Sequence, residues 1–230
     1  LGLGLAPDSQ NRNIYYDPEF LTNYEMGINT KLLNSKLNIG AVIFYSDRED
    51  QQVSISKQVD PRDPNTISYL TPNAAEGTNY GLELSMDTEL TDSLSLFANL
   101  GILKTEIKNW ESRTDLEGRA QAHAPEKSFS LGINWKTTAR TYLSLDVTGK
   151  SSFYYSDSHN NKSRSYSLAN ISYGYRKDSW NYEIWVRNLF NTYYSTRGFY
   201  FGNEAPNFED TLYKRHGDPR HLGISVRYDF

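Results

Sequence analysis

Strict alternation of apolar and other residues runs through most of this chain and constrains its fold more than any other feature. In the last segment the apolar positions are every second residue: Leu222, Ile224, Val226, Tyr228 and Phe230. An earlier segment repeats the pattern at Tyr80, Leu82, Leu84 and Met86. A period of two is that of a β-strand, whose successive side chains point to opposite faces. Since no stretch convincingly shows helical spacing, we expect an all-β protein.

Short polar turns and long polar or proline-containing links alternate between these segments. The short turns lie near 34–36, 91–93, 137–139 and 177–179, and the long links near 57–66, 110–124, 156–163 and 191–219. We predict about nine antiparallel strands, at 22–33, 36–56, 67–90, 94–109, 125–136, 140–155, 164–177, 180–190 and 220–230. Several exceed the five or six residues usual in soluble sheets. Long strands with this rhythm of turns and loops are typical of an outer-membrane barrel.

Composition excludes several other classes of protein. Only 37% of residues are hydrophobic, but 14% are aromatic, which argues against a disordered chain. The formal charge of −4 argues against a general nucleic-acid binder, and the lack of cysteine excludes disulfide scaffolds, thiolate metal sites and cysteine nucleophiles. The longest apolar run, 41–45, is far short of the roughly 18 residues that a spanning helix needs.

Aromatic residues gather near the predicted strand ends, where a barrel has its interfacial girdles. Those near the short turns are Trp135, Tyr173, Tyr175, Trp180, Tyr182, Tyr228 and Phe230, and those near the long links are Phe44, Tyr45, Phe153 and Tyr155. Ordinary strand residues are the alternative, because strands favour aromatic side chains. Charged residues on the opposite faces would point inward: Glu25, Lys31, Glu83, Asp87, Asp146, Lys150, Glu183, Arg187 and Arg227.

An odd number of strands cannot close a bacterial single-chain barrel of this type. An unpaired strand edge in lipid would leave backbone N–H and C=O groups unsatisfied, at several kcal/mol each. The strands near residues 22 and 230 therefore both need partners. For this reason we expect residues 1–230 to be the C-terminal portion of a larger barrel. The chain also opens at Leu1 rather than methionine, as expected of a fragment or of a mature chain whose leader has been removed.

Several short motifs, in order, resemble the barrel of TonB-dependent outer-membrane receptors. They are NYEMGINT (23–30), AVIFY (41–45), DQQV (50–53), NAAEG (73–77), GLEL (81–84), RNLFN (187–191) and GDPR (217–220), with the final aromatic residue Phe230. Each motif is weak alone, but their order and spacing together are fairly specific, and they cover nearly the whole chain.

The resemblance implies a barrel of about 22 strands around an N-terminal plug, with the plug and the remaining strands outside this sequence. It implies a cell outer membrane location in a Gram-negative bacterium and uptake of a scarce ligand, commonly a ferric siderophore, otherwise cobalamin, haem or an oligosaccharide. The implied partners are outer-membrane lipid, the TonB complex acting through the missing N-terminal region, and the barrel-assembly machinery. Phe230 matches the C-terminal signal that this machinery reads.

Two long links carry the candidate ligand-binding residues. The last link combines aromatic rings with one cation: Tyr193, Tyr194, Arg197, Phe199 and Tyr200. A second set lies on the link near 110–124: Trp110, Arg113, Arg119 and His123. Aromatic faces with arginine suit a planar, anionic or catecholate-like ligand. The alternative is that each link simply packs on its neighbours.

We find no motif for catalysis, a resident metal or a cofactor. The four histidines form no His-x-x-x-His pair, and Ser151, Ser152 and His159 lack a nucleophile-elbow pattern. These absences disfavour an enzyme, and the resemblance leads us to interpret the chain as part of a TonB-dependent receptor for a metal chelate. A passive porin-like channel and a soluble all-β carbohydrate-binding module are the alternatives.

Overall fold

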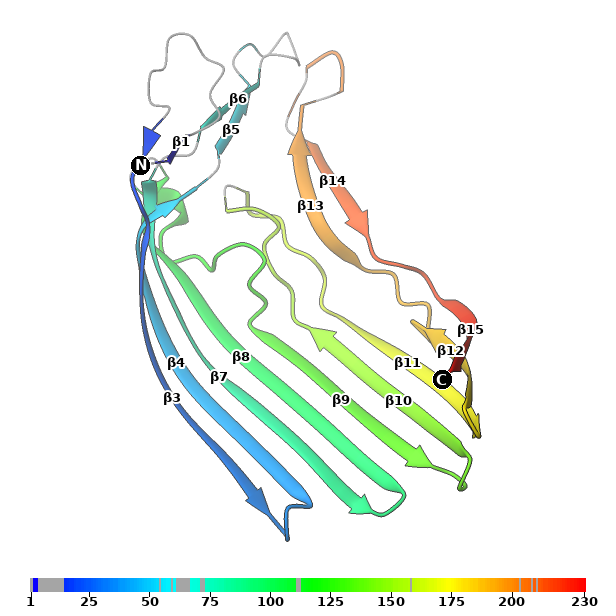
Figure 1. The fold of residues 1–230 in the computed structure, drawn as a ribbon. Helices are drawn as coiled ribbons and strands as arrows, with labels where there is room; N and C mark the ends of the chain where they lie inside the picture. Colours follow the sequence, from blue (N-terminus) through cyan, green and yellow to red (C-terminus); the bar gives the residue numbers. More distant parts are fainter. Residues whose placement is uncertain are drawn as a thin grey trace.

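A nine-stranded antiparallel sheet forms the body of the computed structural model (Figure 1). The model describes residues 2–3, 15–53, 55–58, 60, 67–70, 73–110, 113–157, 159–202, 204–207, 209 and 211–230. In spatial order the strands are β15 (His221–Tyr228), β12 (Trp180–Arg187), β11 (Tyr166–Lys177), β10 (Thr141–Lys150), β9 (Lys127–Lys136), β8 (Leu94–Trp110), β7 (Asn73–Thr91), β4 (Leu37–Gln52) and β3 (Phe20–Leu32). No helix in these ranges is long and apolar enough to cross a bilayer. The predicted nine-stranded meander is confirmed.

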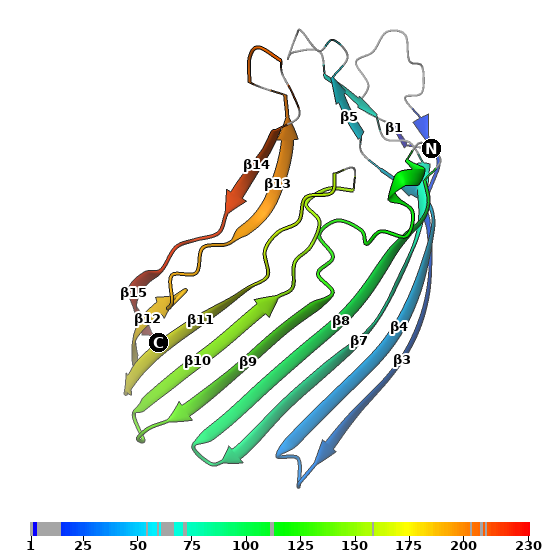
Figure 2. The ribbon, with the colours of Figure 1, turned by 180° about the vertical axis from the view of Figure 1, so that it is seen from behind.

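The structure also contains short strands, outside the main sheet, that the sequence did not predict. The main sheet is joined by three two-stranded sheets: β1 (Gly2–Leu3) with β2 (Tyr15–Tyr16), β5 (Ile55–Gln58) with β6 (Ile67–Leu70), and β13 (Ser195–Phe201) with β14 (Thr211–His216). The strands predicted at 36–56 and 67–90 were therefore too long, because residues 55–58 and 67–70 pair with each other outside the main sheet. The β13–β14 hairpin rises well beyond the sheet (Figure 2).

The turns and links segregate to opposite ends of the sheet, as the alternation of their lengths predicted (Figure 1). At the short-turn end the chain reverses within a few residues, using left-handed backbone at Asn34 (φ 56°) and Asp178 (φ 52°). Asparagine and aspartate tolerate this conformation better than most residues. The long links, with β13 and β14, lie together at the other end, where a ligand-binding surface can form.

The register of the strands separates two chemically distinct faces. Tyr24, Tyr45 and Tyr80 lie side by side on one face, and this face continues along neighbouring strands with Ile43, Leu82 and Ile102. The opposite face carries charged and small residues, for example Glu83 between Val42 and Gly101. We call these the apolar face and the polar face.

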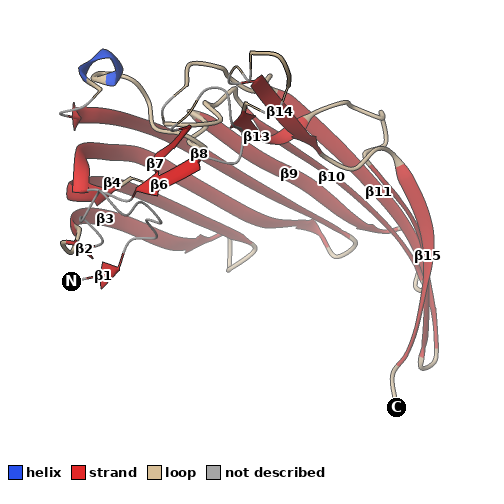
Figure 3. Cartoon of the chain, turned by 90° about the horizontal axis from the view of Figure 1, so that it is seen from above, coloured by secondary structure: helices blue, strands red, loops and turns tan. Residues whose placement is uncertain are grey.

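The side chains of the apolar face are exposed rather than packed in a core. Leu222, Ile224 and Val226 are 73%, 72% and 56% exposed, whereas a soluble sandwich would bury such a face. Seen from above, the sheet follows an open arc (Figure 3). Among the described residues its edge strands β3 and β15 are each paired on one side only, with β4 and β12. These features confirm the predicted inside-out arrangement of a partial transmembrane barrel.

Aromatic side chains border the apolar face at both ends. At the short-turn end Trp180 lies 4.8 Å from Tyr228 and 5.9 Å from Tyr182, measured between ring centroids. At the other end Tyr45 stacks on Tyr80 at 6.5 Å. The segment from Leu37 to Tyr45 is nine residues long, which agrees with the roughly 9–11 residues that a tilted strand needs to cross a bilayer.

Three residues predicted for the upper girdle lie elsewhere. Phe44 faces the polar side, opposite Glu25 and Gly81. Phe153 and Tyr155 are buried, with 7% and 3% exposure, because β10 ends at Lys150 and the following residues fold into the link. Strand alternation cannot be extended past the point where the ladder stops.

Two of the sequence motifs bind each other and fix the position of the last strand. Asn188, 4% exposed, ends β12 with a left-handed backbone (φ 49°). Its amide accepts a bond from the N–H of Thr192 at 2.8 Å and donates to the carbonyl oxygens of Thr192 (2.9 Å) and Asp218 (3.0 Å). Asn191 accepts from the N–H of Arg220 at 2.9 Å. The RNLFN motif thus holds the GDPR motif, which places β15 beside β12.

Replacing Asn188 with alanine should lower the free energy of unfolding of the full receptor by about 1–3 kcal/mol, since several buried backbone groups lose their partner. Urea unfolding of the receptor in lipid vesicles measures the loss. Asn181→Ala, on the preceding strand β12, is the control and should cost about 1 kcal/mol or less. Equal stability of the Asn188 variant and the parent would show that the motif does not hold β15.

A charge on the apolar face should be far more damaging than one on the polar face. Leu100→Arg, half-way along the apolar series of β8, should cost about 2–4 kcal/mol in a bilayer. Asn99→Arg, the preceding residue on the polar face, should cost under about 1 kcal/mol. Assembly and urea unfolding in vesicles compare the two, and equal losses would contradict the assignment of the faces.

Candidate functional site

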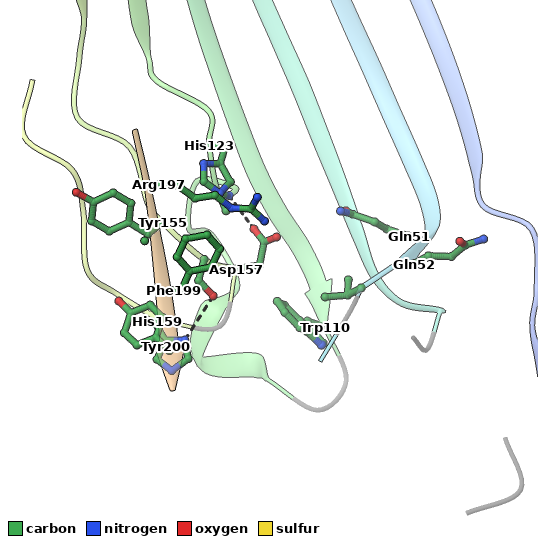
Figure 4. A pocket seen from close by; sticks show the side chains of 14 residues that line it. Gln51, Gln52, Trp110, His123, Tyr155, Asp157, His159, Arg197, Phe199 and Tyr200 are labelled. Atoms are coloured by element: carbon green, nitrogen blue, oxygen red, sulfur yellow. Dashed lines mark hydrogen bonds between the residues drawn. The ribbon is translucent and has the colours of Figure 1, made fainter. Parts of the chain in front are cut away.

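The long links and the β13–β14 hairpin enclose a pocket of about 320 Å³ (Figure 4). Its walls come from four segments that are distant in sequence: the end of β4, the link after β8, the link after β10, and β13. The lining residues are Gln51, Gln52, Val53, Trp110, Ala122, His123, Tyr155, Ser156, Asp157, His159, Arg197, Gly198, Phe199 and Tyr200. Two predicted ligand-binding links therefore do meet at one site.

One wall of the pocket consists of three predicted residues of β13. The guanidinium of Arg197 lies 4.7 Å from the centre of the Phe199 ring. The ring of Tyr200 stacks on His159 with centroids 3.6 Å apart and planes 6° apart. Burial raises the pKa of the Tyr200 hydroxyl, so this hydroxyl remains a hydrogen-bond donor at neutral pH. The wall offers flat rings beside a permanent cation.

Trp110 and His123 also line the pocket, and they play different parts. Trp110 is 1% exposed and packs in a small core with Val53, Ile107 and Leu116, so it anchors the pocket more than it presents a surface. His123 has a left-handed backbone (φ 57°), and its N–H donates to the carbonyl of Tyr154 at 2.9 Å. Its ring is exposed and is available to a ligand.

Arg119 does not line the pocket but ties two of its segments together. Its guanidinium donates to the carbonyl oxygens of Ser156 (3.0 Å), Asp157 and His159 (2.8 Å), and to the side chain of Asn160 (3.0 Å). Burial lowers the pKa of this guanidinium, and the charge of Asp157 partly offsets the effect. An arginine pKa lies so far above neutrality that the group stays charged. Arg119 is a structural clamp between links 110–124 and 156–163.

The remaining predicted residues lie away from this pocket. Arg113 forms an ion pair with Asp115 at 2.8 Å, and this bond raises the pKa of Arg113 and lowers that of Asp115. Tyr193 and Tyr194 line a different pocket at the base of the hairpin. Phe230 is fully exposed, with its ring 5.1 Å from Tyr228, and its role as an assembly signal stays a prediction.

Sequence reasoning missed several lining residues. Gln51 and Gln52 lay inside a predicted strand and were counted as barrel wall. Asp157 lies in the predicted link 156–163, where its carboxylate accepts the N–H of Ala122 at 2.7 Å. His159 was weighed as a metal ligand and with Ser151 and Ser152, but not as a residue of the ligand-binding links. In the structure its Nδ1 lies 3.4 Å from Ser156 Oγ. The sequence contained only a weak signal for Asp157 and His159. The polar link 156–163 was predicted to lie at the same end of the sheet as the two links with aromatic residues.

The fold and the arrangement of its faces define a transmembrane β-barrel wall with a pocket at its long-loop end. The family model described as TonB dependent receptor-like, beta-barrel, matches residues 4–189. The chain therefore belongs to the TonB-dependent receptor family, whose barrels lie in the outer membrane of Gram-negative bacteria. Members of this family are receptors and transporters rather than enzymes.

Individual relatives agree with this assignment. A probable TonB-dependent siderophore receptor, PiuA of Acinetobacter baumannii, is 26% identical over 133 residues, covering 54% of this chain and 16% of PiuA. The ferric yersiniabactin uptake receptor FyuA of Yersinia pestis matches with a TM-score of 0.75 and 20% identity, over 92% of this chain and 30% of FyuA. The ferric-catecholate import receptor Fiu of E. coli K12 matches with a TM-score of 0.70 and 19% identity, over 100% of this chain and 30% of Fiu. The chain thus spans less than a third of the length of each relative.

Arg119→Gln should loosen the link 156–163 because four oxygen acceptors lose a charged donor. Hydrogen exchange of backbone amides in residues 151–163 of the full receptor should become about tenfold faster or more. Arg113→Gln removes an equal charge from an ion pair confined to its own link and should leave those amides unchanged. Unchanged exchange in the Arg119 variant would contradict its role as a clamp.

Proposed function

We propose that this chain is the C-terminal part of the barrel of a receptor that takes up a metal chelate, most specifically a ferric siderophore, by TonB-dependent active transport. The observation that carries the proposal is the pocket that Arg197, Phe199 and Tyr200 of β13 line together with His123. Membership of the receptor family supports the class of function. Because the solved relatives are under 25% identical, their likeness concerns the fold, and the ligand must be argued from the pocket itself.

The pocket suits a flat anionic chelate. Catecholate rings can stack on Phe199 and Tyr200, and Arg197 can donate charge-assisted hydrogen bonds to their oxygens. A cation over an aromatic face adds about 0.5–2 kcal/mol, depending on how far water is excluded. These interactions bind and orient a ligand, and none of them requires a bond to be made or broken by the chain.

The remaining parts of the proposal concern segments and partners outside the chain. An N-terminal plug would occupy the arc facing the polar side of the sheet, and the TonB complex would act on the region before it. Outer-membrane lipid would contact the apolar face. The barrel-assembly machinery would recognise the C-terminal strand, with Phe230 as the residue that it reads.

Energy dependence separates active uptake from a passive porin-like channel. A protonophore that collapses the inner-membrane potential should stop uptake of the chelate while leaving its binding at the cell surface intact. A passive channel would continue to admit the chelate. The carbohydrate-binding alternative is disfavoured because the exposed apolar face of β15 would make a soluble module aggregate.

The ligand assignment is tested by Arg197→Ala in the full-length receptor, expressed in a Gram-negative host. The probe is radioactive iron complexed with 2,3-dihydroxybenzoate, a ferric catecholate. Loss of a charged donor should weaken surface binding about tenfold. The measurement is cell-bound iron in the presence of the protonophore, with cyanocobalamin as a competing non-catecholate ligand.

Arg113→Ala is the matched control, because this arginine has the same charge and lies on a long link but does not line the pocket. It should retain the parent's affinity. If Arg197→Ala also binds the ferric catecholate like the parent, the pocket is not the binding site for this chelate. Strong displacement of the probe by cyanocobalamin would contradict a ferric catecholate as the ligand and favour a cobalamin-type ligand instead.

A further inference from the structure

A second pocket, of about 410 Å³, lies at the base of the β13–β14 hairpin and is cationic. Lys162, Arg164 and Lys214 contribute three basic side chains. Tyr193, Tyr194 and His216 contribute rings with polar atoms. Among the residues that the structure describes, no aspartate or glutamate lines this pocket, so its described lining has a net positive charge.

The cations of this pocket have no acidic partner in the described part of the chain. The salt bridges recorded there involve other arginines: Arg113, Arg187 and Arg227. The ammonium of Lys162 lies 4.2 Å from the centre of the Tyr154 ring, a contact that holds the side chain without neutralising it. Like charges that share a pocket repel each other, and a bound anion relieves that repulsion.

The rings around the cations are held in place before any ligand arrives. Tyr193 Oη and His216 Nε2 are 2.8 Å apart, and the two rings stack with centroids 4.4 Å apart. Tyr194 packs on Tyr166 at 4.6 Å and lies over Gly217, where a Cβ atom would come 2.0 Å from the tyrosine ring. The backbone at Gly217 therefore leaves the room that Tyr194 needs. A preorganised wall lowers the entropic cost of binding.

The position of this pocket connects it to the polar side of the sheet rather than to lipid. Tyr166, which supports Tyr194, is in register with Lys150 on the polar face. Tyr155 lines both this pocket and the pocket of Figure 4. The Tyr155 hydroxyl is hydrogen-bonded to the hydroxyl of Ser195. The side chain of Tyr155 therefore separates the two pockets.

We propose that this second pocket is an oxyanion-binding site for the carboxylate or phosphate groups of a multiply charged soluble ligand, so that the receptor selects chelates of net negative charge. The anion site itself stands on the geometry of Lys162, Arg164 and Lys214. Its part in choosing among iron chelates rests on the proposed function. Neutral hydroxamate-type chelates gain nothing from this pocket.

The anion site is tested with metal-free citrate on the purified full-length receptor in detergent, by isothermal titration. The neutral trimethyl ester of citrate is the matched probe. The parent should bind citrate but not the ester, and more weakly as sodium chloride rises from about 50 to 500 mM, because salt screens the attraction. Lys162→Gln, Arg164→Gln and Lys214→Gln combined should weaken citrate binding more than about tenfold.

Lys108→Gln is the control for nonspecific attraction, because Lys108 is exposed near the end of β8 and lines neither pocket. It should leave citrate affinity unchanged. If the triple variant does not assemble, as judged by heat-modifiable migration on gels, Lys214→Gln alone should still weaken citrate binding several-fold. Equal binding of citrate and its ester, or unchanged affinity in the assembled variants, overturns the anion site.

Two further outcomes separate this inference from the proposed function. If citrate binding is lost in the variants but the parent takes up no ferric chelate, the anion site stands and the uptake proposal fails. If ferric citrate and a neutral ferric trihydroxamate are taken up equally by parent and triple variant, selection by charge is overturned while uptake stands. If lipopolysaccharide displaces citrate but anionic chelates do not, the pocket does bind oxyanions. The proposal that these oxyanions belong to a soluble chelate is then overturned.

Discussion

Everything in this structure depends on the rule that backbone N–H and C=O groups inside a bilayer must be hydrogen-bonded within the protein. A sheet satisfies them only between strands, so each strand of the meander needs two neighbours. The same requirement makes the side chains alternate, because a strand that separates lipid from an interior presents a different solvent to each face. The unpaired edges at β3 and β15 are the places where this chain must meet further strands.

Much of the barrel wall could be predicted from the sequence, because this hydrogen-bonding rule produces a regular alternation of apolar and polar residues along each strand. The alternation at Leu222, Ile224 and Val226 identified the apolar face, and the turn-and-link rhythm gave the nine strands. Strand ends were harder, since alternation says nothing about where hydrogen bonding stops. Phe153 and Tyr155 continue an apolar pattern after Lys150, yet they bury themselves in a link because the ladder with β9 has ended.

The candidate site was only partly predictable, and the reason is geometric. Aromatic and arginine residues on links 110–124 and 191–219 marked the right chain segments, and residues from both meet in one pocket. The sequence could not distinguish residues that line the pocket from residues that build it. Arg119 and Arg197 both lie on links that were predicted to bind the ligand. In the structure Arg119 donates its hydrogen bonds to carbonyl groups of a neighbouring link, whereas Arg197 lines the pocket. Gln51 and Asp157 were missed because only the folded links bring them to the site.

The sheet and the links are stabilised by different interactions: backbone hydrogen bonds between strands hold the sheet, and side-chain hydrogen bonds hold the links. Strand pairing fixes the positions at which each link leaves the wall, and the Asn188–Asp218 bond does the same for the base of the β13–β14 hairpin. Link residues such as Arg119 then fix the pocket with side-chain bonds that can change without disturbing the ladder. Substitution in the links can therefore alter ligand preference while the wall persists, because the bilayer constrains the strands and places no such demand on the links. This separation explains how chains under 25% identical to this one share its fold, and why the ligand has to be inferred from the pockets of this chain.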